Sequence, residues 1–236
     1  MSRNADLPKR LIVAIILAGV AFAALWLGSH VFWLLVAVIG LLMIGEWADL
    51  VGAAPQQRRL AQYALTVPIA LMSPLAAGPG LLSLGFILGA MFFVGAVTRN
   101  TRLAWGILYV GLPVLALLVL RQQPSGFRLT FWTMAIVWAC DSGAYFAGRA
   151  IGGPKLAPMI SPNKTWAGTI GGILSALAFS ILFAMSNPEI GIGMEMILFT
   201  PVLAALAQAG DLYESHLKRV AGVKDSGNLL PGHGGV

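Results

Sequence analysis

Long apolar segments separated by short polar connections run along almost the whole chain. Each is close to the roughly 20 residues that an α-helix needs to cross the hydrocarbon core of a membrane. Pro68 and Pro74 interrupt the third segment, which a membrane helix tolerates when neighbouring groups satisfy the freed carbonyls. The pattern predicts an all-α, polytopic transmembrane helical bundle of about eight spans. The segments lie at about 11–28, 31–48, 60–77, 80–97, 103–120, 130–148, 168–186 and 194–212.

Polar motifs are unevenly divided along the chain. We expect a single integral membrane domain over 1–236, in which the spans of 1–128 carry no motif. The half from 129 to 236 holds two segments, 149–168 and 210–236, that are rich in Gly, Pro, Lys, Ser, Thr, Asp and His. Because functional residues concentrate on loops and helix ends, the second half is predicted to be the catalytic half.

Composition and charge support a membrane protein and orient it. Hydrophobic residues make up 58% of the chain and charged residues only 10%, whereas a soluble domain carries about 25% charged residues. If the N-terminus is cytoplasmic and eight spans alternate, the outer loops hold only Arg121 and Arg128, two of the fifteen basic residues. Basic residues favour the cytoplasmic side, so the N-terminus and the polar segments are predicted to lie there.

Two other kinds of site are not expected. The net charge of +6 does not predict nucleic-acid binding, because cytoplasmic loops and anionic headgroups account for the basic residues. The single cysteine, Cys140, excludes an internal disulfide and lies in an apolar run. His216 and His233 lack the spaced Cys or His partners of a zinc site.

The first candidate motif is Cys140-Asp141-Ser142-Gly143-Ala144-Tyr145-Phe146-Ala147-Gly148-Arg149. Asp141 follows an uncharged run from Phe131, and a carboxylate at a membrane helix centre costs roughly 2.5 to 3.5 kcal/mol. We therefore expect Asp141 to face a polar cavity that contains a partner. The alternative is a structural pair with Arg149 near the membrane surface.

The second motif, Ser161-Pro162-Asn163-Lys164-Thr165-Trp166-Ala167-Gly168, comes just before an apolar segment. Hydroxyls, a lysine and the free N–H groups of a starting helix suit a phosphate. An N-cap with a lysine that reaches toward water explains the same residues, and the sequence leaves both interpretations open.

The third motif begins with Gln208-Ala209-Gly210-Asp211 and extends through Arg219 to Gly235. If 204–220 is helical, Asp211, Glu214, Ser215 and Lys218 share one face. Carboxylates beside lysines suit a divalent cation that holds a polyphosphate. An amphipathic helix on anionic headgroups is the alternative, but it does not explain Asp211 at the end of an apolar segment or the Gly-His-Gly-Gly sequence at 232–235.

These blocks resemble the signature of the phosphatidate cytidylyltransferase (CDP-diacylglycerol synthase) family. The resemblance covers the chain from 131 to its end, whereas the N-terminal half matches only by its hydropathy. The matching blocks are Asp141-x-x-Ala144-Tyr145-x-x-Gly148-Arg149, Ser161-Pro162-Asn163-Lys164-Thr165, Gly210-Asp211-Leu212-x-Glu214-Ser215, Ser215-His216-Leu217-Lys218-Arg219, Gly222-Val223-Lys224-Asp225 and Pro231-Gly232-His233-Gly234-Gly235.

The resemblance implies a nucleotidyltransferase of phospholipid biosynthesis that converts CTP and phosphatidic acid into CDP-diacylglycerol and pyrophosphate. It implies Mg²⁺ as a cofactor, K⁺ as a companion ion, and a bacterial inner membrane location, and it leaves a homodimer open. Metal ligands are expected at Asp211 and Asp225, with Asp141 as a further candidate. The catalytic residues would be Asp141, Lys164, Asp211, Glu214, Lys218, Asp225 and His233. Substrate would be bound by Tyr145, Arg149, Ser161, Asn163, Thr165, Ser215, Arg219, Lys224, Gly232, Gly234 and Gly235.

Two departures from the family pattern affect these expectations. Ala167 stands where the family usually has Glu. The family signature also continues into Asp-Arg-x-Asp and a further helix, whereas this chain ends at Val236. We therefore expect a C-terminally truncated form with little or no activity.

Two other functions remain as alternatives. A CTP-dependent lipid or polyprenol kinase would transfer the γ-phosphoryl group and release CDP. An ion-coupled transporter would use Asp141 as an ion site, although the gathering of the motifs at one membrane face argues against it.

Overall fold

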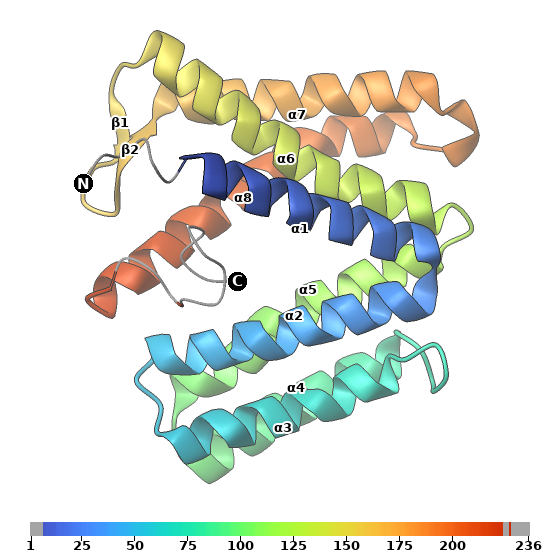
Figure 1. Cartoon of the computed structure of the whole chain (residues 1–236), viewed down its shortest axis with the longest axis vertical. Coiled ribbons are helices and arrows are strands. Elements are labelled where there is room, and N and C mark those ends of the chain that lie inside the picture. The colour runs from blue at the N-terminus through green and yellow to red at the C-terminus, as the bar shows by residue number, and fades with distance from the viewer. Residues whose placement is uncertain (1–6, 224–226, 228–236) are drawn as a thin grey trace. The chain divides into compact units, whose positions relative to one another are not determined.

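The computed structural model describes residues 7–223 and residue 227. Eight α-helices and one two-stranded hairpin are found in this part of the chain (Figure 1). The helices are α1 (Leu7–Leu27), α2 (Ser29–Leu50), α3 (Pro55–Leu71), α4 (Leu81–Thr98), α5 (Thr101–Gln122), α6 (Gly126–Ile151), α7 (Trp166–Ser186) and α8 (Met194–Val220). The strands are β1 (Lys155–Ala157) and β2 (Ser161–Thr165), and a short 3₁₀ turn, η1 (Pro188–Ile190), precedes α8.

Each apolar segment of the sequence corresponds to one helix, and α3 differs most in its bounds. It begins at Pro55, before the expected start at about residue 60, and ends at Leu71, before Pro74. Proline suits the first helical position because its missing N–H would be unpaired there in any case. The hydropathy pattern predicted a later start because four polar residues, 56–59, follow Pro55 at the start of α3.

Five helices are long and apolar enough to cross a membrane: α2, α4, α5, α7 and α8. The described part of the chain therefore fits an all-α integral membrane protein. In α1 the described apolar stretch is shorter, Ile15–Leu27, and α3 has only 17 residues. α6 carries Arg128, Asp141 and Arg149 along its length. The expectation of eight spans stays a prediction.

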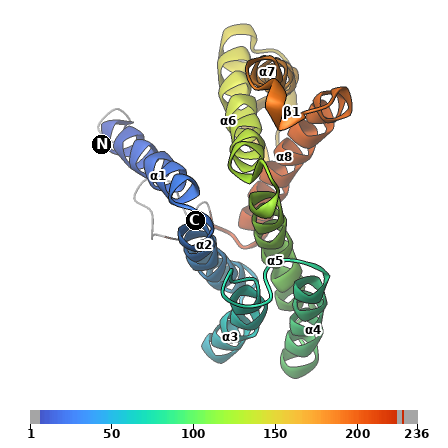
Figure 2. The same ribbon diagram turned by 90° about the vertical axis from the view of Figure 1, so that its right-hand side faces the viewer.

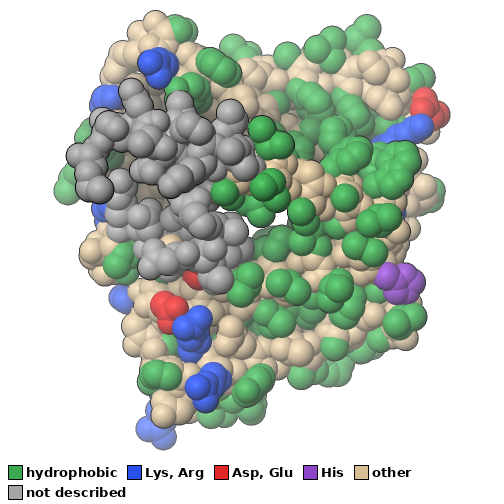
Figure 3. Space-filling model, in the orientation of Figure 1, with side chains coloured by type: hydrophobic (Ala, Val, Ile, Leu, Met, Phe, Trp, Pro, Cys, Tyr) green, Lys and Arg blue, Asp and Glu red, His purple; other side chains and the backbone are tan. Residues whose placement is uncertain are grey.

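Large apolar side chains face outward on many helices. Leu81 is 87% exposed and Phe92 79% exposed, both on α4. Figure 3 shows hydrophobic side chains along the flanks of the helices, while Lys and Arg gather near helix ends. This distribution suits helices whose flanks contact lipid hydrocarbon and whose ends reach the polar headgroups.

The described residues divide into two compact units, one that contains 7–124, 221–223 and 227 and the other 125–220. In the first unit, α2, α3, α4 and α5 pack together, and α1 packs on α2. Its fully buried side chains include Ile44, Leu65 and Ile107. Trp47 on α2 also donates a 2.9 Å hydrogen bond to the carbonyl of Arg102 on α5.

The second unit contains α6, α7, α8 and the hairpin, and α7 packs extensively against α6. Figure 2 shows α7 nearly end-on beside α6. Glycines permit this close approach. A Cβ on Gly172 of α7 would lie 2.7 Å from the carbonyl oxygen of Cys140, and one on Gly168 would lie 2.9 Å from that of Ala144. A Cβ on Gly143 of α6 would lie 2.1 Å from the Ser175 hydroxyl. Small residues at a helix interface bring two backbones close together, as is common in membrane proteins.

The hairpin is an addition to the all-α prediction. β1 pairs antiparallel with β2, with Lys155 opposite Thr165 and Ala157 opposite Ser161. It connects α6 to α7 and contains most of the second sequence motif. The polar segment expected before the seventh apolar run is thus ordered by backbone pairing.

Candidate active site

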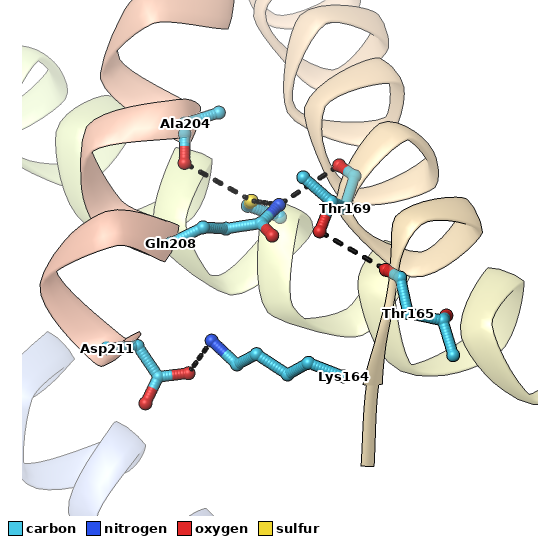
Figure 4. A network of polar contacts seen from close by, with 7 residues as sticks. Lys164, Thr165, Thr169, Ala204, Gln208 and Asp211 are labelled. Carbon is cyan, nitrogen blue, oxygen red and sulfur yellow. Dashed lines mark hydrogen bonds and ion pairs between the residues drawn. The ribbon is translucent and has the colours of Figure 1, made fainter. Parts of the chain in front are cut away.

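Three elements of the second unit each bring one charged residue to the same place. α6 provides Asp141, β2 provides Lys164 and α8 provides Asp211. Lys164 and Asp211 form an ion pair, with side chains 23% and 54% exposed (Figure 4). Asp141 is close enough to interact electrostatically with both residues. We call these three residues the charged cluster.

The start of α7 fixes the position of Lys164. The next residue, Thr165, ends β2 and is the N-cap of α7, and its hydroxyl accepts a 3.1 Å hydrogen bond from the Gly168 N–H. Thr165 is only 5% exposed, and the following N–H, of Trp166, donates to the carbonyl of Pro154 at 3.1 Å. The predicted N-cap is therefore confirmed, whereas the lysine of the motif pairs with Asp211. Phosphate binding by the motif stays a prediction.

A set of uncharged hydrogen bonds lies beside the charged cluster and joins all three helices (Figure 4). Gln208 of α8 donates through Nε2 to the Cys140 sulfur of α6 at 3.3 Å and to the Thr169 carbonyl of α7 at 3.1 Å. The Cys140 thiol donates to the carbonyl of Ala204 at 3.8 Å. The Thr169 hydroxyl donates to the carbonyl of Thr165 at 3.2 Å. We call Cys140, Thr169 and Gln208 the amide link.

Sequence reasoning did not assign a role to Gln208. Its side chain is 7% exposed, in a helix apolar enough to span a membrane. A polar side chain buried in such a helix is expensive unless it is hydrogen-bonded. The sequence contains one indication of a role for Gln208, which is its position one helical turn before Asp211.

α8 continues without a break to Val220, so the prediction that Asp211, Glu214, Ser215 and Lys218 share one helical face is confirmed. Glu214 and Lys218 form an i,i+4 ion pair at 2.5 Å. Asp211 pairs with Lys164 of β2, a partner that the spacing within α8 did not indicate.

On α6, Arg149 donates a 3.0 Å hydrogen bond to the hydroxyl of Tyr145, one turn before it. The ion pairs found among the described residues do not include the suggested one between Asp141 and Arg149. Asp141, Tyr145 and Arg149 follow each other at intervals of four residues and share one face of the helix. Tyr145 is 58% exposed in the described part of the chain.

The remaining predicted site residues fall into two groups. Ser161 and Asn163 lie on β2, and Ser215 and Arg219 lie on α8. The predictions at Lys224, Asp225, Gly232, His233, Gly234 and Gly235 lie outside the described residues.

The donor set of the charged cluster fits magnesium only in part. The described residues hold no group of three or more His, Cys, Asp or Glu arranged for a metal ion. Magnesium, however, is often bound by one or two carboxylates, with substrate phosphates and water completing its shell. Asp141 and Asp211 can supply two such carboxylates, so the residues fit a cation that arrives with a polyphosphate.

Comparison with known proteins gives consistent matches. The model of the cytidylyltransferase family matches residues 8–236. The phosphatidate cytidylyltransferase of Brucella suis biovar 1 (strain 1330) is 40% identical over 238 residues, which cover 98% of this chain and 87% of that protein. The protein of that name from Pseudomonas aeruginosa is 35% identical over 246 residues, 98% of this chain and 90% of its own length. The one from Bacillus subtilis is 42% identical over 130 residues, 55% of this chain and 48% of its own.

Proposed function

The chain belongs to the cytidylyltransferase family, and on that premise we propose that it is a membrane enzyme that makes CDP-diacylglycerol. An oxygen of the phosphatidic acid phosphate attacks the α-phosphorus of CTP. A new P–O bond to the lipid phosphate forms, the bond between the α- and β-phosphates breaks, and pyrophosphate leaves with the electron pair. The relatives from Brucella suis and Pseudomonas aeruginosa, both named phosphatidate cytidylyltransferase, support this assignment.

The observation that carries the proposal in this chain is the charged cluster. Phosphoryl and nucleotidyl transfer depend mainly on positioning and charge neutralisation. Lys164 is held by Asp211, so its ammonium group is oriented before substrate arrives. A triphosphate has more negative charge than one carboxylate and can share or replace Asp211 as the partner of Lys164.

The other named residues bind substrate in this proposal. Lys218, paired with Glu214, adds positive charge along the same helix as Asp211. Arg149, oriented by Tyr145, is placed on α6 to contact an anionic headgroup, since a guanidinium binds phosphate oxygens in pairs. Ser161, Asn163, Thr165, Ser215 and Arg219 remain candidates for hydrogen bonds to the substrates.

We further propose magnesium as the cofactor, held by Asp141 and Asp211 together with the triphosphate, and with Asp225 as a further candidate. The bound cation would neutralise negative charge on the phosphates. Potassium remains a proposed companion ion.

The proposed location is the bacterial inner membrane, with the charged cluster on the cytoplasmic side. Two considerations support it: CTP is a cytoplasmic nucleotide, and the basic residues of the sequence favour that side. A site at the membrane surface lets a soluble nucleotide meet the phosphate of a lipid that stays in the bilayer.

Product analysis tests the function. The full-length protein in phosphatidic acid vesicles should be given magnesium and CTP labelled at either the α- or the γ-phosphate. We expect α-label in the lipid product and γ-label in pyrophosphate. Transfer of γ-label to lipid, with release of CDP, would identify a lipid kinase. Solute uptake with neither transfer would identify a transporter.

A further inference from the structure

The amide link lies next to the charged cluster and connects α6, α7 and α8 through buried hydrogen bonds. We propose that Gln208 is a positioning residue, which sets the spacing of the three elements that carry Asp141, Lys164 and Asp211. The inference deepens the proposed function and rests on it. Gln208 is not a catalytic residue in this account, because it acts through its neighbours.

The orientation of the Gln208 amide follows from its partners. The carbonyl oxygen of Thr169 can only accept a hydrogen bond, so the amide nitrogen of Gln208 must face it. The second amide hydrogen then points to the Cys140 sulfur. Both donors of one side chain are therefore used on two different helices.

Each residue of the charged cluster lies close in sequence either to Gln208 or to a residue that hydrogen bonds connect to Gln208. Asp141 directly follows Cys140, which is held between Gln208 and Ala204 on α8. Lys164 directly precedes Thr165, whose carbonyl accepts from Thr169. Asp211 lies one helical turn after Gln208 itself. A shift of Gln208 relative to α6 or α7 therefore changes the distances among Asp141, Lys164 and Asp211.

A second buried polar link provides a matched comparison. Trp132 of α6 donates to the Ser180 hydroxyl of α7 at 3.1 Å, and Thr200 of α8 hydrogen-bonds the same hydroxyl at 3.0 Å. Thr200 is fully buried, as Gln208 nearly is. It joins the same three helices but lies eight residues, or about 12 Å along the helix, before Gln208. Loss of either link removes buried hydrogen bonds, but only the amide link adjoins the charged cluster.

The test compares Gln208→Met, which keeps a similar volume but removes both donors, with Thr200→Val in the full-length protein. We expect Gln208→Met to lower kcat at least ten-fold and to raise the magnesium concentration for half-maximal rate several-fold. Thr200→Val should lower the thermal stability about as much as Gln208→Met does. It should nevertheless change kcat and the magnesium requirement less than two-fold. Equal effects of the two variants on kcat, or an unchanged magnesium requirement in Gln208→Met, would overturn the proposal.

A distance measurement made without substrate or metal tests the positioning role of Gln208 independently of the proposed enzymatic function. Spin labels at Ile151→Cys on α6 and Val220→Cys on α8, both exposed positions, report the spacing of the two helices, while fully buried Cys140 stays unlabelled. The distance distribution should broaden with Gln208→Met and not with Thr200→Val. If Gln208→Met does not fold, Cys140→Ala, which removes one arm of the link, should broaden it as well. Unchanged distributions would contradict the positioning role, whereas an inactive wild type with the expected broadening would contradict only the proposed function.

Discussion

Lys164 is paired with Asp211, and Asp141 lies within electrostatic range of both residues. Like charges that lie close together are destabilising, and a carboxylate within a largely apolar helix adds a cost of desolvation. A bound cation would offset the repulsion between the two carboxylates. Functional sites often combine unfavourable local interactions with high activity in this way.

Asp141→Asn should therefore lower activity at least 100-fold without lowering stability. The variant removes the repulsion and keeps the size of the side chain, so Tm in detergent should stay equal or rise by a few degrees. Turnover of labelled CTP and thermal unfolding should be measured on the same preparation. A clear fall in Tm would show instead that Asp141 is a structural residue whose loss of activity reflects unfolding.

Substitutions at Thr165 test the contribution of the α7 N-cap to stability. Thr165→Val removes the hydroxyl that accepts from Gly168 and should cost about 1 kcal/mol of stability, as is usual for an N-cap. Thr165→Ser should restore the stability because it keeps the oxygen. If valine left the unfolding free energy unchanged, the cap would not contribute to stability.

At the scale of elements, the contact between α6 and α7 should be the least tolerant part of the second unit. A Cβ at Gly172 would meet the Cys140 backbone carbonyl at 2.7 Å, and backbone cannot move aside as a flexible side chain can. Gly172→Ala should destabilise the protein by roughly 1 to 3 kcal/mol, as overpacking does. Gly89→Ala on α4 is the control, since a Cβ there meets nothing within 4 Å. Similar unfolding temperatures for the two variants would contradict the close packing.

The helices were predictable because hydrophobic runs of membrane length leave few alternatives, as for α4 (Leu81–Thr98) and α7 (Trp166–Ser186). The hairpin was not predictable in this way. β1 has only three residues, and β2 contains a proline and mostly polar side chains, a composition that is typical of a loop. The sequence motifs contained Lys164 and Asp211, but their pairing depends on tertiary structure between distant parts of the chain. Gln208 stands at the start of the third motif but received no role, because a single glutamine in an apolar run does not reveal its partners on α6 and α7.

At the scale of the whole molecule, membrane orientation can be tested by labelling single cysteines in a background without Cys140. Gln56→Cys between α2 and α3 and Asn163→Cys on β2 should react from the cytoplasmic side. Gln123→Cys after α5 should react only from the outside. The reason is the enrichment of basic residues on one side of the predicted spans. Reaction of positions 56 and 163 from opposite sides would contradict the eight-span topology.

In the proposed mechanism, residues from separate elements of the second unit act as one catalytic group on CTP and phosphatidic acid. The most direct measurement is a double-mutant cycle with Lys164→Met and Asp211→Asn, read as kcat/KM for CDP-diacylglycerol formation by the full-length protein in vesicles. Glu189→Gln provides the control, because it breaks another exposed ion pair of the same unit, with Arg128, and should change kcat/KM less than two-fold. Each single variant should lose about 100-fold or more, and the double variant should be little worse than the poorer single one, because groups that act as a unit are strongly non-additive. Losses that simply multiply, to roughly 10,000-fold, would show that Lys164 and Asp211 act independently.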